Sequence, residues 1–546
     1  MTTRAPQLTP GSAPAAEPLT ARLRRAWPWA VAAVVIAILF FVYWRLSWSA
    51  AANSDSGSTA LQAHDVVHGN WLLTGWWMSD VSFYTTEVPQ YMLLELVFGL
   101  GPGVVHIAAA MTYTLIVVLV ALLAQGQARG AEGWARAGLA GALVASPQVS
   151  GALILLLGPD HTGTVVPVLA TWLVIDRARP RWYVPVVVGV MLTWIMAADS
   201  VVLFTAIGPI IIAAALRALR RGQGNRRWYE LSLAAAAAIA AGVGLLIPKI
   251  IVRLGGFQLW HFETHTMPLS KLPHDSWDTI QAVLQFFGAD PVGAHPLIES
   301  VLTTVHIAGV LLAVAGLCVA VARFFREDQI VVPGLAVGIL LELGAFLISI
   351  HSSNLDSTRE IVAVLPLGAV LAGRTLGGPV LAALRPAAWR GSAAWRWLRA
   401  VAASLAVVVA AGYLGALAYA AVQPSIPSAN QPLASWLVAH HLTNGLASYW
   451  EADSVTLDTG GKVTVSSVEI DRFDKLIPYK WETDTTQYDP KLHDARFVVA
   501  GGPAADLPIA GLARAAIHTF GSPSHIYQVG SYTILVWNYN ILGHLD

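Results

Sequence analysis

Residues 26–44 read AWPWAVAAVVIAILFFVYW, an apolar run without a single charged side chain. A helix of about 20 such residues spans the hydrocarbon core of a bilayer. Similar windows recur along the 546-residue chain, which is 55% hydrophobic and 12% charged. Soluble domains carry about twice that share of charge. The sequence therefore predicts a polytopic α-helical membrane protein.

A cleaved signal peptide is the alternative interpretation of this first run, because the small-residue stretch SAAANS follows it at 49–54. The apolar core of a signal peptide, however, measures about 7–15 residues. The run in this chain is longer, and a long leader precedes it. We therefore expect an uncleaved first transmembrane helix.

The apolar windows predict eleven spanning helices. Their expected ranges are 27–48, 103–125, 136–157, 163–177, 182–198, 200–217, 228–251, 297–323, 330–350, 358–374 and 398–421. The short window 163–177 and the run near 375–388 leave this count open. The predicted domains are a cytoplasmic segment 1–26, a transmembrane domain 27–422 with a first outer loop at 49–102, and a C-terminal domain 425–546.

Arginine placement predicts the orientation in the membrane. Six segments hold 21 of the 33 Lys and Arg residues: 1–26, 126–136, 177–181, 217–227, 323–329 and 374–399. Positive residues favour the cytoplasmic side of membrane helices. The amino terminus is therefore expected in the cytoplasm, and an odd number of spans places the C-terminal domain outside. Because Arg outnumbers Lys 27 to 6, we expect a bacterial plasma membrane.

This orientation brings five polar stretches to the outer side. They are the first outer loop, LLLGPDHTGT (155–164), the helix junction at Asp199, the loop 257–277, and HSSNLDSTRE (351–360). Polar groups at membrane depth are costly and tend to line a cavity. We expect these stretches to converge on one pocket at the outer leaflet.

The first outer loop has a distinctive order of residues. Asp55 comes soon after the first helix, GNW stands at 69–71, and FYTTEVPQYMLL (83–94) leads into the second span. This order resembles the first outer loop of the GT-C glycosyltransferases, which take sugar from a polyprenyl-phosphate carrier and include protein O-mannosyltransferases and lipid A aminoarabinose transferases. Late in the chain, STREIVAVLPLGAVLAG (357–373) is similar to that family's Arg-containing penultimate helix with its Leu-Pro.

The resemblance implies roles for two carboxylates. Asp55 would be the general base that takes the proton of the acceptor hydroxyl in a single, inverting displacement. Glu87 could orient acceptor or sugar hydroxyls. The alternatives are that Asp55 caps the helix that follows and that Glu87 is an exposed loop carboxylate. The family often has a second acid beside the first, and Ser56 occupies that position here.

Four basic residues are candidates for the donor phosphate. Arg359 offers a fixed fork of donors that fits phosphate oxygens, and Lys249, Arg253 and His161 could share this role. The alternatives for Arg359 are snorkelling to the interface or an ion pair with Glu360 or Asp356. Lys249 and Arg253 could instead anchor lipid headgroups, and a lone histidine such as His161 is more often structural.

The remaining pocket candidates are polar residues of the other outer stretches. They are Asp160, Asp199, His261 and His265. Asp199 could equally cap a helix. WHFETHT (260–266) has the spacing of a metal site only on a strand or loop, and no strong zinc motif is present. His64 and His68 share a helix face, where packing along the membrane surface is favoured over chemistry. We expect no required cofactor and no metal in the reaction, although the sequence leaves a divalent metal open.

The C-terminal segment changes in character after the linker PSIPSANQP (424–432). PLASWLVAHHL (432–442) and LPIAGLARAAIH (507–518) predict helices, and DARFVVAGG, SHIYQVG and SYTILVWNY predict strands. SVTLDTGGKVTVSSV (454–468) predicts two strands around a turn. The expectation is an α/β domain without a nucleotide or metal motif, which packs or positions the acceptor.

The leading functional hypothesis is a glycosyltransferase that moves sugar from a polyprenyl-phosphate carrier to a glycan, lipid or protein acceptor of the envelope. A transporter or flippase of lipid-linked cargo is the first alternative, but transporters usually show internal repeats and polar residues at the midplane. A non-catalytic glycan-binding protein is the second. The net charge of zero gives no indication of nucleic acid, and the single cysteine, Cys318, excludes an internal disulfide.

Overall fold

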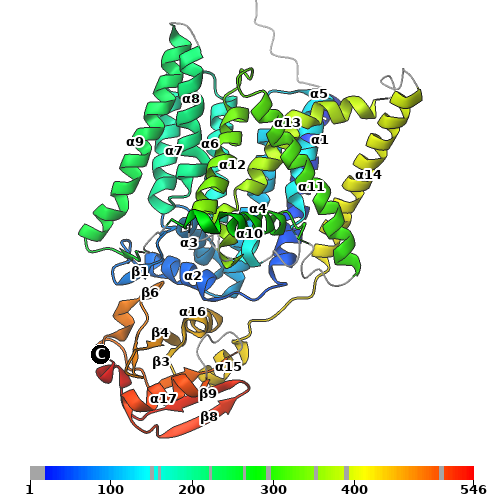
Figure 1. Cartoon of the computed structure of the whole chain (residues 1–546). Coiled ribbons are helices and arrows are strands. Elements are labelled where there is room, and N and C mark those ends of the chain that lie inside the picture. The colour runs from blue at the N-terminus through cyan, green and yellow to red at the C-terminus, as the bar shows by residue number, and fades with distance from the viewer. Residues whose placement is uncertain are drawn as a thin grey trace, which may run out of the picture.

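The computed structural model describes residues 19–147, 153–157, 161–220, 224–261, 266–290, 297–349, 355–385, 393–502 and 509–545. A bundle of long helices carries a sheet-containing C-terminal domain against one of its ends (Figure 1). Of the candidate site residues, Asp160 and His265 lie outside the described residues.

Eight helices in the described part of the chain are long and apolar enough to cross a membrane. They belong to α1 (Leu19–Ser47), α4 (Pro102–Gln125), η3 with α8 (Leu203–Ile207 and Gly208–Arg220), α9 (Asn225–Arg253), α11 (Leu297–Ala322), α12 (Val331–Ile348), η6 with α13 (Leu355–Ile361 and Val364–Leu384) and α14 (Ala393–Ala421). The prediction of a multi-pass membrane protein is confirmed.

Three further predicted spans appear as shorter helices of the same bundle. They are α5 (Gly130–Ala145), α6 (Thr162–Arg177) and α7 (Tyr183–Ala198), of 16 residues each. The bounds predicted for the span 136–157 are wrong, because α5 ends at Ala145 and a separate π-helix, η2, lies at Leu153–Leu157. Helix α7 packs on α9, α6 on α4, and α5 on α13. Because they are shorter than a full span, the count of eleven stays a prediction.

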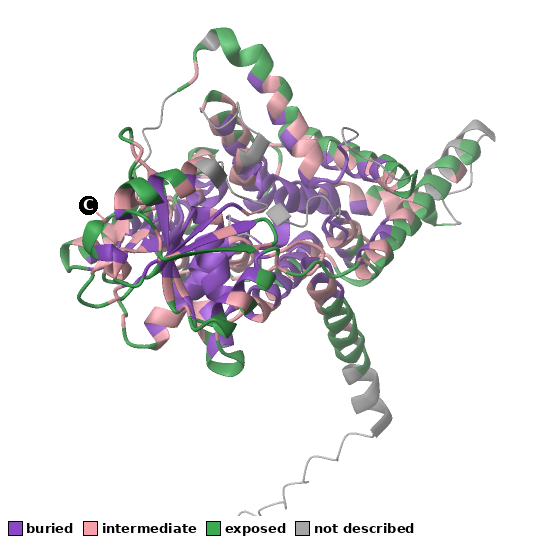
Figure 2. Cartoon of the chain, turned by 90° about the horizontal axis from the view of Figure 1, so that it is seen from below, coloured by how far each residue is buried: buried purple, intermediate pink, exposed green. Residues whose placement is uncertain are grey.

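The bundle has a buried centre and apolar outer helices. Every residue of α13 from Val364 to Arg374 is buried, whereas α1, α9 and α14 expose large apolar side chains such as Ile38, Leu246 and Val407. Figure 2 shows the same contrast between the buried interior and the exposed peripheral helices. Apolar side chains exposed on long helices are the expected lipid-facing surface.

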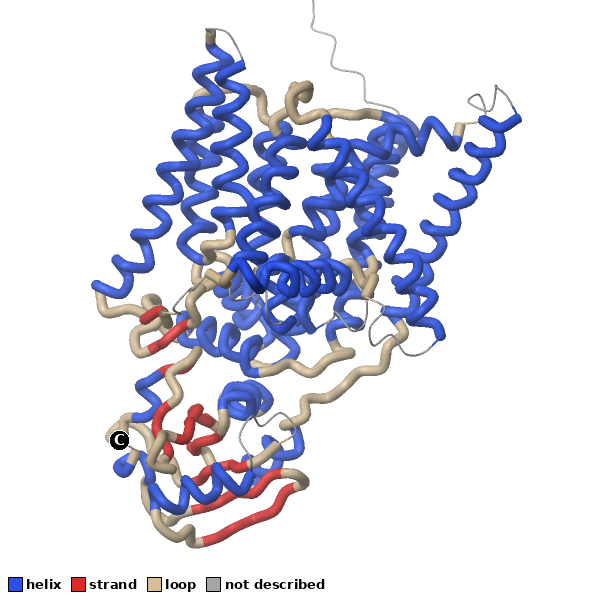
Figure 3. Tube along the Cα trace, viewed as in Figure 1, coloured by secondary structure: helices blue, strands red, loops and turns tan. Residues whose placement is uncertain are grey.

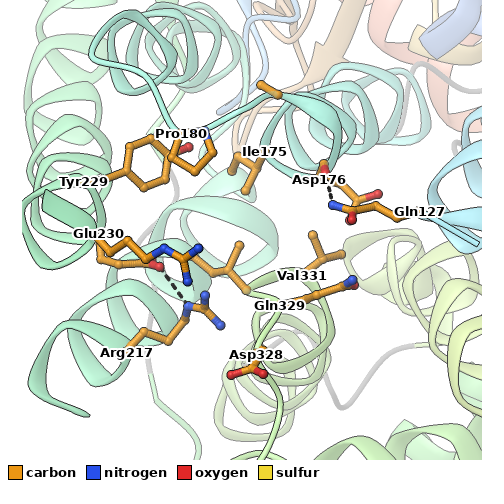
Figure 4. A pocket seen from close by; sticks show the side chains of 13 residues that line it. Gln127, Ile175, Asp176, Pro180, Arg217, Tyr229, Glu230, Asp328, Gln329 and Val331 are labelled. Atoms are coloured by element: carbon orange, nitrogen blue, oxygen red, sulfur yellow. Dashed lines mark hydrogen bonds and ion pairs between the residues drawn. The ribbon is translucent and has the colours of Figure 1, made fainter. Parts of the chain in front are cut away.

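Four of the arginine-rich segments meet at the end of the bundle away from the C-terminal domain. Gln127, Pro180, Arg217 and Asp328, one from each segment, line a single pocket of about 270 Å³ (Figure 4). Segments that the sequence assigned to one side therefore do lie together, while the assignment of that side to the cytoplasm stays a prediction.

The opposite end carries the first outer loop, which folds into α2 (Ser54–Val67), β1 (Trp76–Met78) and α3 (Glu87–Phe98). Asn53 begins α2, because its side chain accepts from the Ser56 backbone N–H while the Ser56 hydroxyl faces the Asn53 backbone N–H. Such a reciprocal cap satisfies two of the unpaired donors of a helix start. Asn53 rather than Asp55 is thus the cap, and the capping alternative for Asp55 is wrong.

The C-terminal domain is a six-stranded sheet with helices. Its elements are α15 (Gln431–Ala439), β3 (Asn444–Ala447), α16 (Tyr449–Asp458), β4 (Thr464–Ile470), β5 (Leu476–Pro478), β7 (Phe497–Ala500), α17 (Ile509–Phe520), β8 (His525–Val529) and β9 (Tyr532–Val536), with strand order β5-β4-β3-β7-β9-β8. Strand β3 is parallel to β4 and β7, and the other pairs are antiparallel.

The helix and strand predictions for this domain hold except at 454–458. Those residues end helix α16, whereas the sequence predicted a strand there. The error has a physical cause: residues 451 to 457 are all buried, so α16 lacks the exposed polar face that marks a helix in a sequence.

Two of the connections between the domain and the bundle are made by the backbone. A loop runs from α14 to α15 (Figure 3), and its Ile426 N–H donates to Trp48 O at 2.7 Å. In addition, β6 (Thr483–Asp484) of the domain pairs with β1, whose other side pairs with β2 (Gln258–Leu259). Beyond β6, the backbone N–H and the hydroxyl of Thr485 both donate to Gly75 O. The first outer loop is therefore held by the C-terminal domain.

Replacing Gly75 by Ala should loosen this connection. Gly75 has φ +94, and an added Cβ would lie 2.6 Å from Thr486 and 2.7 Å from Asp484. Gly69→Ala is the matched control, because Gly69 has φ +103 in the same loop and nothing within 4 Å of an added Cβ. Both variants carry backbone strain of about 1–3 kcal/mol, because alanine rarely adopts such positive φ angles. Only Gly75→Ala should raise amide hydrogen exchange at 483–486, and equal exchange in both variants would contradict the connection.

Candidate active site between the helix bundle and the C-terminal domain

Small residues on one face of α2 let the C-terminal domain approach closely. Ser54, Gly57 and Ser58 are spaced to share a face, and a Cβ added at Gly57 would lie 3.3 Å from the Asp453 carbonyl oxygen of α16. The Ser54 hydroxyl donates to the Tyr449 carbonyl oxygen at 2.5 Å. This contact between α2 and α16 determines what surrounds Asp55, which lies in the first turn of α2.

The Asp55 carboxylate joins three distant parts of the chain. Its Oδ2 lies 3.6 Å from Arg359 Nη1, and its Oδ1 accepts a hydrogen bond of 2.6 Å from the Tyr449 hydroxyl. The side chain of Asp55 is 16% exposed and that of Arg359 is 37% exposed. An acid of the first outer loop and the cation before α13 thus lie together beside the C-terminal domain, with part of each accessible.

Two more carboxyl groups from the C-terminal domain surround Asp55. Glu482 Oε2 lies 2.9 Å from the Tyr449 hydroxyl and accepts from the Ser58 hydroxyl at 2.8 Å. Tyr449 has one hydroxyl hydrogen, so it donates to only one of its two carboxyl neighbours at a time. Burial, followed by the charges of Glu482 and Asp55, raises the pKa of the Asp453 carboxyl well above its usual range. The same surroundings raise the pKa of Tyr449, which stays a neutral donor.

A second polar group, centred on His161, is linked to the group around Asp55 by two consecutive residues of η6. Arg359 faces Asp55, while the carboxylate of Glu360 lies 3.2 Å from His161 Nε2. His161 Nδ1 lies 2.8 Å from Asp199 Oδ2. Burial lowers the pKa of His161, but the charges of Asp199 and Glu360 together raise it well above its usual value. A histidinium between two carboxylates therefore ties together the segments before α6, after α7 and before α13.

This arrangement changes the interpretation of His161 and Asp199. Both ring nitrogens of His161 face carboxylates, so neither points to a phosphate. Asp199 is buried, directly follows α7, and its Oδ1 accepts from the Val201 backbone N–H at 2.9 Å. We interpret His161 and Asp199 as residues that position η6, and with it Arg359.

Glu87 is buried, so its interpretation as an exposed loop carboxylate is wrong. Its side chain is 3% exposed, accepts from the Thr86 hydroxyl, and packs where a Cβ on Gly163 would lie. Burial raises the pKa of Glu87 to about 8. At neutral pH the carboxyl is therefore mostly protonated, and a protonated carboxyl can donate a hydrogen bond but cannot act as a base.

The other basic candidates lie at the surface of the described structure. Lys249 and Arg253, in the last turns of α9, are exposed, and so is His261 after β2. No ion pair among the described residues joins Lys249 or Arg253 to Asp55 or its neighbours. Contact with the donor phosphate stays a prediction for Lys249 and Arg253, as does a place in the pocket for His261.

An aromatic cluster lies where β1, β2 and the C-terminal domain meet. The Trp77 ring is 5.9 Å from that of Trp260, which is 6.2 Å from that of Trp481, and Lys480 Nζ lies 5.7 Å from the Trp77 ring centre. Trp481 immediately precedes Glu482. The cluster therefore adjoins the carboxyl group that contacts Tyr449.

Tyr449, Asp453 and Glu482 are not among the residues that the sequence predicted for the site. All three lie in the C-terminal domain and belong to no recognisable motif. Tyr449 is 394 residues from Asp55 in the sequence. One signal existed: YWEAD (449–453) places an aromatic and an acid four residues apart, on one helix face.

Comparisons with known proteins bear on the fold. No protein-family model and no curated protein sequence matches this chain. The apo structure of ArnT from Cupriavidus metallidurans matches 96% of this chain and 99% of its own, with 16% identity and a TM-score of 0.53. ArnT bound to undecaprenyl phosphate matches 95% and 99%, with 15% identity and a TM-score of 0.52.

The oligosaccharyltransferase AglB from Archaeoglobus fulgidus, in complex with an inhibitory peptide and a dolichol-phosphate, also matches. It covers 88% of this chain and 70% of its own, with 11% identity and a TM-score of 0.46. The match to ArnT over almost the full length of both chains confirms the fold that the first outer loop predicted. The chain has the fold of the GT-C membrane glycosyltransferases, with a sheet-containing C-terminal domain.

Proposed function

We propose that the protein is a glycosyltransferase that moves a sugar from a polyprenyl-phosphate carrier to an envelope acceptor on the outer face of a bacterial plasma membrane. The observation that carries this proposal is the placement of Asp55 beside Arg359 and Tyr449, at the junction of three parts of the chain. The fold shared with ArnT supports it, and one of the matching ArnT structures holds undecaprenyl phosphate.

Asp55 is the proposed general base. Its Oδ1 is held by the Tyr449 hydroxyl, which fixes the plane of the carboxylate, and its Oδ2 lies 3.6 Å from Arg359 Nη1. An acceptor hydroxyl within hydrogen-bond reach of Oδ2 would lose its proton as it attacks the anomeric carbon. A single displacement of this kind inverts the anomeric centre.

Arg359 is the proposed contact for the donor phosphate. A guanidinium carries five N–H donors in a planar fork, and the side chain of Arg359 is 37% exposed. It would stabilise the charge that develops on the phosphate as the sugar leaves. Arg359 Nη1 and Asp55 Oδ2 are in direct contact at 3.6 Å, so the two side chains would separate as the acceptor hydroxyl, the anomeric carbon and the phosphate enter between them for an in-line displacement.

The C-terminal domain is the proposed acceptor side of the site. It contributes Tyr449 to Asp55, and Trp481 to the cluster with Trp77 and Trp260. Aromatic faces offer apolar area with little loss of side-chain freedom, and they stack on the faces of sugar rings. As proposed, the reaction needs no cofactor, because the carrier phosphate is the leaving group.

Asp55→Asn should reduce transfer by about 10²–10⁴-fold, the usual contribution of a general base. The assay uses the full chain in nanodiscs, radiolabelled polyprenyl-phosphate sugars and extracted envelope acceptors. Asp65→Asn is the matched control on the same helix, because its amide oxygen can still accept from Trp76 Nε1. Wild-type turnover by Asp55→Asn, or movement of labelled lipid across vesicles without covalent product, would refute the proposal.

Tyr449→Phe should lower kcat more than it raises KM for the acceptor. The variant loses the hydroxyl that holds Asp55, and hydrogen bonds to charged groups contribute about 1.5–3 kcal/mol. That range corresponds to a fall of about 10–100-fold in kcat. Tyr527→Phe, in strand β8 away from Asp55, is the control. If both variants turn over like the wild type, Tyr449 does not hold the base.

Glu87→Gln should flatten the dependence of thermal stability on pH. The pKa of Glu87 is raised from 4.5 to about 8 by folding, so the wild type loses stability as pH rises from about 4.5 to about 8, by at most about 1.4 kcal/mol per unit. The neutral amide does not titrate. Glu132→Gln, at a half-exposed ion pair, is the control, and parallel melting curves for Glu87→Gln and the wild type from pH 5 to 8.5 would contradict the burial of a neutral carboxyl.

A further inference from the structure

We propose that His64, His68 and Glu95 form a binding site for a divalent transition-metal ion, with Zn²⁺ as the favoured ion, between helices α2 and α3. One ligand atom from each of the three side chains lies within 4.8 Å of the other two. This site is separate from the proposed reacting groups, since Asp55 lies in the first turn of α2, whereas His64 lies in its last turn and His68 directly follows it.

The two histidines are arranged as metal ligands on one helix usually are. They are four residues apart on α2, and their ring centres are 4.1 Å apart. A pair at i and i+4 on one helix face, supplemented by a carboxylate, is a common zinc-binding arrangement. Glu95 of α3 supplies the carboxylate from the facing helix, where its Oε1 contacts His64 Nδ1.

The ring of His68 is already oriented for a metal. Its Nδ1 lies 2.7 Å from the His64 carbonyl oxygen, which accepts only if Nδ1 carries the proton. The lone pair is then on Nε2. Metal-binding histidines almost always donate their other ring N–H in this way, and the bond fixes both the tautomer and the ring orientation.

Burial of the carboxylate favours a cation at this place. The side chain of Glu95 is 6% exposed, whereas that of His64 is 35% exposed and His68 lies at the surface. A metal ion can therefore reach the site from the solvent side and compensate a charge that is largely removed from water. Four-coordinate Zn²⁺ has ligands about 3.3 Å apart, so rotation of the side chains closes the remaining gap.

The bound ion would fasten α2 to α3. Both helices contribute to one apolar cluster that includes Leu61, Tyr91 and Leu94, so the metal would add a cross-link to an existing contact. Three protein ligands leave a fourth position for water. We place no reaction step at this ion, and its role is to hold the first outer loop, which carries Asp55 and Glu87.

The test uses the full chain in nanodiscs after treatment with chelator. Titration with Zn²⁺ alone should show one equivalent bound with micromolar or tighter affinity, and Co²⁺ should give the visible absorption of a tetrahedral site. His68→Ala and Glu95→Gln should each weaken Zn²⁺ binding by at least about tenfold. Zn²⁺ should also slow amide exchange at 60–68 and 91–98 in the wild type, but not in His68→Ala.

His440→Ala is the matched control. His440 is exposed, its Nδ1 lies 2.9 Å from the carbonyl oxygen four residues earlier, and its ring stacks on Trp436, but no carboxylate in the described part of the chain forms a metal-binding group with it. Its replacement should leave the affinity unchanged. Failure of the wild type to bind Zn²⁺ at 100 µM, or equal affinity in the wild type and His68→Ala, would overturn the site. Because no sugar donor is present, this outcome is independent of whether the protein transfers sugar.

Discussion

The close packing of α2 against α16 is the contact on which the rest of the site depends. The small face made by Ser54, Gly57 and Ser58 brings the two helix backbones together, and only at that separation does the Tyr449 hydroxyl reach Asp55 at 2.6 Å. A larger residue at position 57 would separate the helices and remove this hydrogen bond without touching either of its groups. A site whose geometry depends on helix separation is therefore shaped by residues that have no chemistry of their own.

The membrane fold could be predicted because its signal is local. Uncharged windows of helix length are visible one at a time, and eight of them are long apolar helices in the described structure. The pairing of Asp55 with Arg359 could also be expected, since both residues lie in stretches that resemble one family and that the arginine pattern assigns to one side. The first half of the C-terminal strand prediction was wrong because α16 is a buried helix. A buried helix has no exposed polar face, so its sequence lacks the repeat of apolar and polar residues by which a surface helix is recognised.

The other contacts of the site could not be predicted. They join residues that are far apart in the sequence, and a local pattern around one residue does not indicate its distant partner. Nothing in the sequence pairs Glu360 with His161, yet their 3.2 Å contact is the reason that we interpret His161 as a residue that positions η6. Nothing pairs Tyr449 with Asp55, 394 residues earlier. Local patterns report which side of a membrane a residue occupies. They do not report which neighbours form hydrogen bonds with its side chain. A residue whose polar atoms all have partners within the protein can position other groups, whereas a reacting residue needs an atom that is open to the substrate.

The group around His161 is expected to be rigid, whereas Arg359 beside it is partly exposed, and the difference has a physical reason. The histidinium of His161 is compensated by Asp199 and Glu360 inside the protein, and breaking a buried pair of this kind leaves an uncompensated charge at a cost of about 3–5 kcal/mol. Such a group resists movement and fixes the backbone of η6. Arg359, the next residue, is 37% exposed, so exchanging its neighbours costs far less. A rigid anchor beside an adaptable cation would allow the Arg359 side chain to change its partners while the backbone of η6 stays in place.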